Sequence, residues 1–136
     1  EHDLAVLRLF DQWGNPTKAE DRAPIPIGDR ELEVGEEIKV LGFPGMGGIK
    51  ITITPGEQSG WWTGAGDGWT GEFYKTSAKM GPGVSGGAAF SALTGEFVGV
   101  PTGGSSSSDD EGDTLGLIRP NIYLIPLLDR VERSNS

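Results

Sequence analysis

The 136-residue chain has no cysteine and a single histidine, His2. Without thiols it can form neither a disulfide framework nor a thiolate metal site, and one imidazole cannot build a histidine-rich zinc site. We therefore expect no bound metal, and no pattern in the sequence indicates a cofactor.

Basic residues are also few, with 11 Lys and Arg against 20 Asp and Glu, for a formal net charge of −9. They are scattered rather than clustered, and a surface that binds a phosphate backbone needs a basic cluster. No apolar run approaches the roughly 20 residues of a membrane span. We therefore expect neither a nucleic-acid nor a membrane partner.

What the chain has in abundance is glycine, with 23 residues, and 9 prolines accompany them. This composition favours short strands and many turns within one domain. Alternating or apolar runs predict short strands, spaced as in a β-barrel or sandwich. They are expected at residues 4–10, 36–42, 48–54, 72–77, 88–90, 95–100 and 114–118, with 72–77 as the return strand of a hairpin.

The first of these strands, Leu4–Phe10, is apolar on both faces except at Arg8, which is typical of a strand covered on both sides. The chain enters this run abruptly after Glu1, so we expect a fragment or processed product of a longer protein. Residues 11–29 carry three prolines and predict an extended connector.

A half-buried strand is expected where Ile49, Ile51 and Ile53 alternate with polar residues. Near the end, Asn121–Arg133 has helical spacing and should pack one helix on the β core, beginning or kinking at Pro126.

Two other segments have an unusual composition, but neither predicts a functional site. The acidic, serine-rich run at residues 103–113 predicts a mobile, solvated loop, because it lacks the fixed spacing of a calcium loop. Trp61, Trp62 and Trp69 surround a hairpin turn, and we assign them no function.

The stretch "GPGVSGG" at residues 81–87 places one hydroxyl, on Ser85, among four glycines. Serine attacks a carbonyl only with help from a base, and the resulting oxyanion needs fixed donors. Glycines allow backbone N–H groups to converge where a Cβ would block them. The stretch is therefore a candidate nucleophile loop, and a plain glycine-rich turn is the alternative.

Four blocks in order strengthen the catalytic interpretation. They are "DLAVLRL" (3–9), "PIPIGDRELEVGEEIKVLGFPGMGG" (24–48), "ITITPGEQSGWW" (51–62) and "TSAKMGPGVSGGAAFSALTGEFVGVPTGG" (76–104). Their order and content resemble the trypsin-like serine peptidases, and among these the cysteine-free, HtrA-like bacterial type. The similarity covers about Asp3 to Gly104.

The resemblance implies an all-β fold, with a trypsin-like antiparallel barrel and a C-terminal helix. Residues 1–28 would be the end of the first barrel, including its last strand, and the inter-barrel connector. Residues 29–136 would be the second barrel with the nucleophile loop. An extracytoplasmic location is favoured on the same ground.

Carried over position by position, the resemblance makes Ser85 the nucleophile and Asp3 the triad aspartate. The backbone N–H groups of Gly83 and Ser85 would form the oxyanion hole. A polypeptide would be the substrate.

The same resemblance places Thr102, Gly103 and Gly104 on the edge strand that pairs with substrate. Lys79 would lie near the base of the side-chain pocket. Pointing inward it would favour acidic substrates, but it can equally turn to solvent.

Two departures from the family pattern bear on activity. The family's catalytic histidine lies tens of residues before the aspartate, on a first barrel that this chain lacks. His2 is adjacent to Asp3, and neighbours on a strand point to opposite faces, so His2 is not expected to act as the base. Val84 stands where relatives carry aspartate or asparagine, so activation by a salt bridge there is not available.

Three functions follow from these observations. The chain is the C-terminal part of a serine endopeptidase, inactive alone and completed by the missing N-terminal barrel. Alternatively, it is a pseudo-peptidase or peptide-binding module that uses the same β-edge. In the third, it is a structural domain in which "GVSGG" is only a turn.

Overall fold

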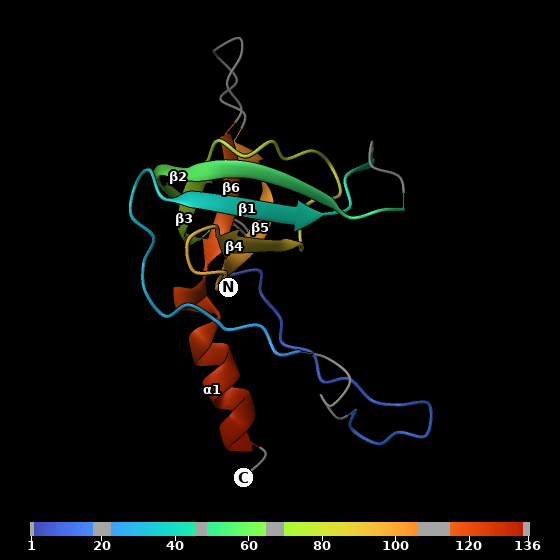
Figure 1. Ribbon diagram of the computed structural model, residues 1–136. Helices are drawn as coiled ribbons and strands as arrows, with labels where there is room; N and C mark the ends of the chain where they lie inside the picture. The colour runs from blue at the N-terminus through green and yellow to red at the C-terminus, as the bar shows by residue number, and fades with distance from the viewer. Residues whose placement is uncertain (1, 18–22, 46–48, 65–69, 106–114, 135–136) are drawn as a thin grey trace.

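The computed structural model describes residues 2–17, 23–45, 49–64, 70–105 and 115–134. Six antiparallel strands form a closed barrel in the order β1-β2-β3-β6-β5-β4, which confirms the predicted all-β fold (Figure 1). The elements are β1 (Glu37–Gly42), β2 (Thr52–Gly64), β3 (Gly71–Thr76), β4 (Ala88–Ser91), β5 (Phe97–Ser105), β6 (Leu115–Pro120), η3 (Asn121–Tyr123) and α1 (Ile125–Ser134).

Alternate residues of the strands fill the barrel interior. In β1, Ile38 and Val40 are buried while Glu37 and Lys39 are exposed, as period-two geometry requires. The same interior receives residues from several strands and two loops, which join into one apolar cluster. Its buried members are Leu32, Ile38, Val40, Tyr74, Ala78, Val84, Ala89, Val98 and Ile118.

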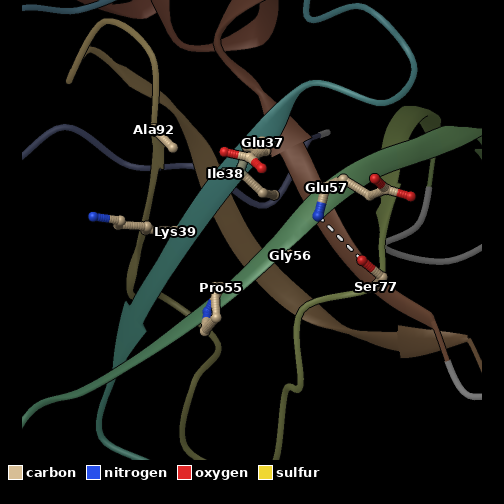
Figure 2. Close-up of a pocket in the computed structure, with 8 residues that line it drawn as sticks. All are labelled: Glu37, Ile38, Lys39, Pro55, Gly56, Glu57, Ser77 and Ala92. Carbon is tan, nitrogen blue, oxygen red and sulfur yellow. Dashed lines mark hydrogen bonds between the residues drawn. The ribbon is translucent and has the colours of Figure 1, made fainter.

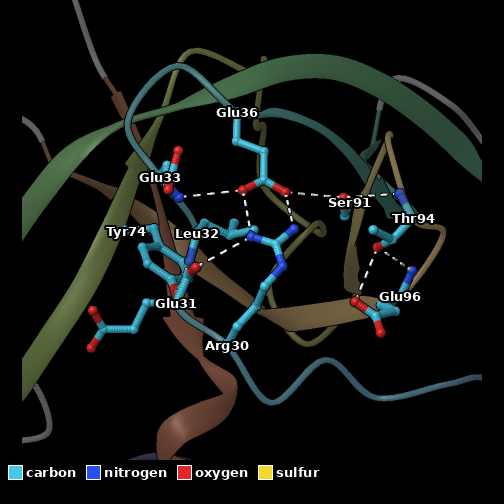
Figure 3. A network of polar contacts seen from close by, with 9 residues as sticks. All are labelled: Arg30, Glu31, Leu32, Glu33, Glu36, Tyr74, Ser91, Thr94 and Glu96. Atoms are coloured by element: carbon cyan, nitrogen blue, oxygen red, sulfur yellow. Dashed lines mark hydrogen bonds and ion pairs between the residues drawn. The ribbon is translucent and has the colours of Figure 1, made fainter.

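The predicted connector, residues 11–29, is extended only in part, because residues 12–14 form a turn whereas residues 23–29 are extended. The stretch from residue 23 to 36 is tied to the barrel at two places. Gly28 donates its N–H to the carbonyl of Phe97 at 2.9 Å, and the Asn121 amide donates to the carbonyl of Gly28 at 2.9 Å. Farther along, Arg30 donates to Glu36 at 2.8 Å, and the Ser91 hydroxyl donates to the same carboxylate at 3.1 Å (Figure 3). The network joins the connector to β1 and β4.

The strand predicted at Leu4–Phe10 does not form. Residues 2–9 have no ladder partner among the described residues, and only Phe10 makes an isolated bridge, to Pro16. Leu7 is 81% exposed. A strand needs a neighbour for its N–H and C=O groups, and none of the described strands lies alongside.

The isoleucines of the third predicted strand do alternate with polar residues, but their face is the outer one. Ile49 is 96% exposed, and Ile51 and Ile53 are each more than half exposed. Thr54 is partly buried instead, and its hydroxyl donates to the Lys79 carbonyl at 2.9 Å. Periodicity separates two faces of a strand but does not identify which one meets the core.

The helix begins at Ile125, with Pro126 in its first turn, so the proline starts the helix rather than kinking it. The expected packing on the β core is wrong. No residue of α1 is buried, and the helix projects away from the barrel below η3 (Figure 1). The η3 turn, where Leu124 donates its N–H to Asn121, redirects the chain away from the sheet.

Some expectations concern parts of the chain outside this description. Of the predicted acidic loop, Gly103–Ser105 belong to β5, whereas residues 106–113 lie outside the described residues. Trp69 also lies outside them. Within the described ranges, no helix is long and apolar enough to cross a bilayer.

The Arg30–Glu36 contact predicts acid-sensitive stability. Arg30 lowers the pKa of Glu36 in the folded state below its usual 4.5. Its stabilisation is therefore full above that usual pKa and is lost as pH falls through the lowered folded pKa. Because the Arg30 side chain is 42% exposed, we expect Glu36→Gln to cost only about 1 kcal/mol at neutral pH.

Urea unfolding of both proteins across the acid range measures this loss. The difference between wild type and Glu36→Gln should vanish in acid, and the nearby Glu31→Gln should behave like wild type throughout. A difference that stays constant with pH would show that the Glu36 charge does not stabilise the fold.

Candidate active site

Ser85 is exposed, on the loop that joins β3 to β4. Backbone hydrogen bonds shape this loop from within: Val84 donates to Gly81 at 3.2 Å, and Gly87 donates to Val84 at 2.9 Å. A further bond, from Gly86 to Pro101 at 2.8 Å, ties it to β5. The serine is therefore presented by an ordered turn, three residues before β4 begins.

Val84 holds this loop in place, because its side chain enters the barrel core. It is only 5% exposed, whereas its neighbour Ser85 faces outward. The residue that departs from the family pattern thus replaces a polar anchor by an apolar one. Burial of a valine side chain contributes about 1.5 to 3 kcal/mol.

Two glycines allow the loop to approach the end of β1. Gly83 has a φ of 98°, and a Cβ there would collide with the carbonyl of Phe43. A Cβ at Gly87 would collide with the carbonyl of Leu41. Any side chain at either position would push the serine loop off β1.

The same loop leaves donors unused. Among the described residues, the N–H groups of Gly83 and Ser85 donate to no backbone or side-chain acceptor. The Ser85 hydroxyl likewise makes no hydrogen bond within the described ranges. One hydroxyl and two free backbone donors therefore occupy three consecutive residues.

A hollow of about 420 Å³ opens beside Ser85. Apart from the serine and the loop glycines, its lining is apolar, and part of it comes from the exposed side chains of Ile25, Phe43 and Ile51. These outward-facing residues, which periodicity alone does not connect with the serine, are the part of the site that sequence analysis missed.

Asp3 does not lie beside Ser85. It acts electrostatically on Arg119, near the end of β6, and its backbone has a φ of 51°. His2 stacks on Tyr123 with ring centroids 4.2 Å apart. Ser85 lies by β1 and β4, and in the closed strand order the β1–β4 seam is opposite the β3–β6 seam. The structure thus leaves the two predicted triad residues apart.

Thr102, Gly103 and Gly104, the residues predicted to pair with substrate, lie on β5. Beyond Gly99, β5 has no further ladder pairs with β4, whereas its pairing with β6 continues to Ser105. On the open side, the one described backbone bond in this stretch is from Gly86 to Pro101. The three residues therefore border the serine loop on an unpaired edge.

Lys79 is exposed and lines a separate hollow of about 460 Å³ with Pro44 and Met80. Met80, which the sequence analysis passed over, is the residue that reaches the strands: a Cβ on Gly116 would collide with its sulfur. The glycine in "TLGLI" was the available signal, since it marks a close approach.

A third hollow, of about 350 Å³, lies on the outer face of β1 and β2 (Figure 2). Glu37 and Glu57 are opposite each other across this ladder, and Glu57 donates its N–H to the Ser77 hydroxyl at 3.1 Å. Ser85 does not line it. In the part of the chain described, no group of three or more His, Asp or Glu side chains could hold a metal ion.

The barrel, the serine loop and the unpaired edge together define the class. The family model of the trypsin-like peptidase domain matches residues 1–100. The chain therefore belongs to the trypsin-like peptidase family.

Solved structures support the same conclusion. The HtrA-type protease AlgW with a tripeptide shares 25% identity at a TM-score of 0.64, covering 79% of this chain and 35% of its own. A serine endoprotease from Yersinia pestis shares 25% identity at a TM-score of 0.64, over 88% of this chain and 39% of its own.

A variant of AlgW with a decapeptide has 23% identity and a TM-score of 0.65, over 82% of this chain and 33% of its own, and shows the fold alone. The chain thus spans little more than a third of these structures. A search of curated proteins found no match.

The burial of Val84 predicts a cost for restoring the family's polar residue. Val84→Asn loses apolar burial and places an amide in the core, so we expect the free energy of unfolding to fall by about 3 kcal/mol. Urea unfolding measures the change. Val34→Asn, at a position 67% exposed, is the matched control and should cost less than about 0.5 kcal/mol. Equal effects at both sites would refute the anchoring role of Val84.

Proposed function

We propose that this chain is the C-terminal part of a trypsin-like serine endopeptidase in which Ser85 is the nucleophile. The observation that carries the proposal is the exposed Ser85 hydroxyl flanked by the unbonded N–H groups of Gly83 and Ser85, on a loop fixed by Val84. A peptide carbonyl attacked by the hydroxyl would develop its negative charge where those donors are available.

The substrate is a polypeptide, paired as an added strand along Thr102, Gly103 and Gly104. The open side of β5 next to the serine loop supports this placement, because main-chain bonds to an edge strand position a peptide without requiring a given sequence. Among the matched structures, AlgW is accompanied by a tripeptide and a variant of AlgW by a decapeptide.

Asp3 is the proposed triad aspartate, and the general base is a histidine supplied by a first barrel. The only imidazole of the chain stacks on Tyr123, far round the barrel from Ser85. Catalysis therefore requires that the N-terminal segment leave its present place and join the first barrel. The matched structures extend well beyond this chain, which leaves room for such a barrel in a longer protein.

The domain division follows the same proposal. Residues 1–28 belong to the end of the first barrel and the connector, and residues 29–136 form the second barrel with its helix. The unpaired, largely exposed segment before Phe10 supports this division, since apolar strand-like sequences without a partner are stable only when another sheet receives them.

The first experiment compares hydrolysis by the 136-residue chain and by a longer protein that includes a first barrel. Without its base, the chain should show at most the residual acceleration of about 10³- to 10⁴-fold over water. In the longer protein, a fluorophosphonate should label Ser85, and Ser85→Ala should abolish the label.

Ser77→Ala, which removes an exposed hydroxyl eight residues earlier, is the matched control and should leave labelling intact. A folded longer protein that is never labelled would overturn the peptidase proposal. Rapid peptide turnover by the 136-residue chain alone would overturn the need for an external base.

A peptide-binding module without hydrolysis is the second candidate. The observation in its favour is that no described side chain accepts a proton from Ser85 while an apolar hollow and a free edge remain beside it. If this is the function, the chain and its Ser85→Ala variant should bind an unstructured peptide with equal affinity in calorimetry, and no longer form should cleave it.

A further inference from the structure

Arg119 is a buried cation that the proposed mechanism does not use. Arg119 is only 2% exposed, yet its Nε and Nη2 atoms have no hydrogen-bond partner in the described structure. Only Nη1 is bonded, to the carbonyls of Thr70 at 2.9 Å and Glu72 at 3.3 Å. A buried charge with unused donors is costly, and a nearby anion reduces that cost.

Two aromatic rings cover the guanidinium. Its central carbon lies 3.6 Å from the centroid of the Phe73 ring and 5.1 Å from that of Tyr123. The Tyr123 hydroxyl in turn accepts the N–H of Glu72 at 2.8 Å. Cation–π contacts favour the charged form but supply no full counter-charge.

The N-terminal segment meets this corner. The His2 ring packs on Tyr123 with centroids 4.2 Å apart, and its Nδ1 lies 3.4 Å from the Thr70 carbonyl that Arg119 also contacts. Burial lowers the pKa of Arg119, and Tyr123 and then the Asp3 carboxylate act in the opposite direction. The segment therefore places the His2 ring on Tyr123, which itself covers Arg119, and the charge of Asp3 favours the protonated guanidinium.

We propose that Arg119 and Tyr123 form a latch that holds His2 and Asp3 on the far side of the barrel from Ser85. The latch is autoinhibitory, an inference that rests on the proposed role of Asp3 as the triad aspartate. While the segment is docked, the carboxylate cannot orient a base at the serine, and its release is a step that precedes catalysis.

Nuclear magnetic resonance of the 136-residue chain tests the docking without any activity. Because the chain has one histidine, the two imidazole ring-proton signals belong to His2 without ambiguity. They therefore report directly whether the segment is docked. In wild type, the Tyr123 ring should displace these signals from their random-coil positions. Asp3→Asn and Arg119→Met should each return them most of the way, whereas Arg130→Met, on the exposed helix, should not move them.

The proposal is overturned if the wild-type signals lie at random-coil positions, or if either Asp3→Asn or a folded Arg119→Met leaves them unchanged. If Arg119→Met does not fold, the His2 signals of Asp3→Asn decide the test, because Asp3 is exposed and its replacement should not prevent folding. This result is independent of whether Ser85 reacts, so failure of the latch and failure of the peptidase proposal are distinguishable.

Autoinhibition itself is tested by the rate of fluorophosphonate labelling in the longer protein. Arg119→Met should raise that rate if the latch competes with the assembled triad. An unchanged or lower rate in a folded variant whose His2 signals have moved would overturn the inhibitory role.

Discussion

The entry of Val84 into the barrel core is the contact on which the candidate site depends. Val84 is buried, and Ser85, which follows it directly in the turn, is exposed. The same insertion presses the loop against the end of β1, where only glycine fits at positions 83 and 87. The buried side chain of Val84 and the absence of side chains at Gly83 and Gly87 thus fix the position of the loop. The exposed hydroxyl and the unused N–H groups lie on the loop that they fix.

This anchoring differs in kind from a salt bridge. An ion pair below a nucleophile can form or break with a new chain terminus, whereas a valine in a closed barrel is released only when the barrel opens. The barrel therefore carries the Ser85 loop in a fixed position. Under the proposed function, any control of the chemistry acts on the groups that reach Ser85, and the N-terminal segment, whose His2 ring packs on Tyr123, is one of them.

The barrel strands could be predicted because their alternating residues and glycine turns are local signals. Ser85 was found in the same way, from its glycines, and its setting in the family came from the order of four blocks. What could not be predicted depends on neighbours. Leu4–Phe10 has strand composition but no adjacent strand, and α1 is amphipathic but leaves the sheet at η3.

The isoleucines illustrate the same limit and connect it with function. Their alternation was clear, but hydrophobicity alone favoured the interior, and Ile51 instead lines the hollow at Ser85 together with Ile25 and Phe43. Exposed apolar groups beside Ser85 are unfavourable in water. Under the proposed function, a polypeptide or a first barrel would cover them, and the apolar surface removed from water would then contribute to binding.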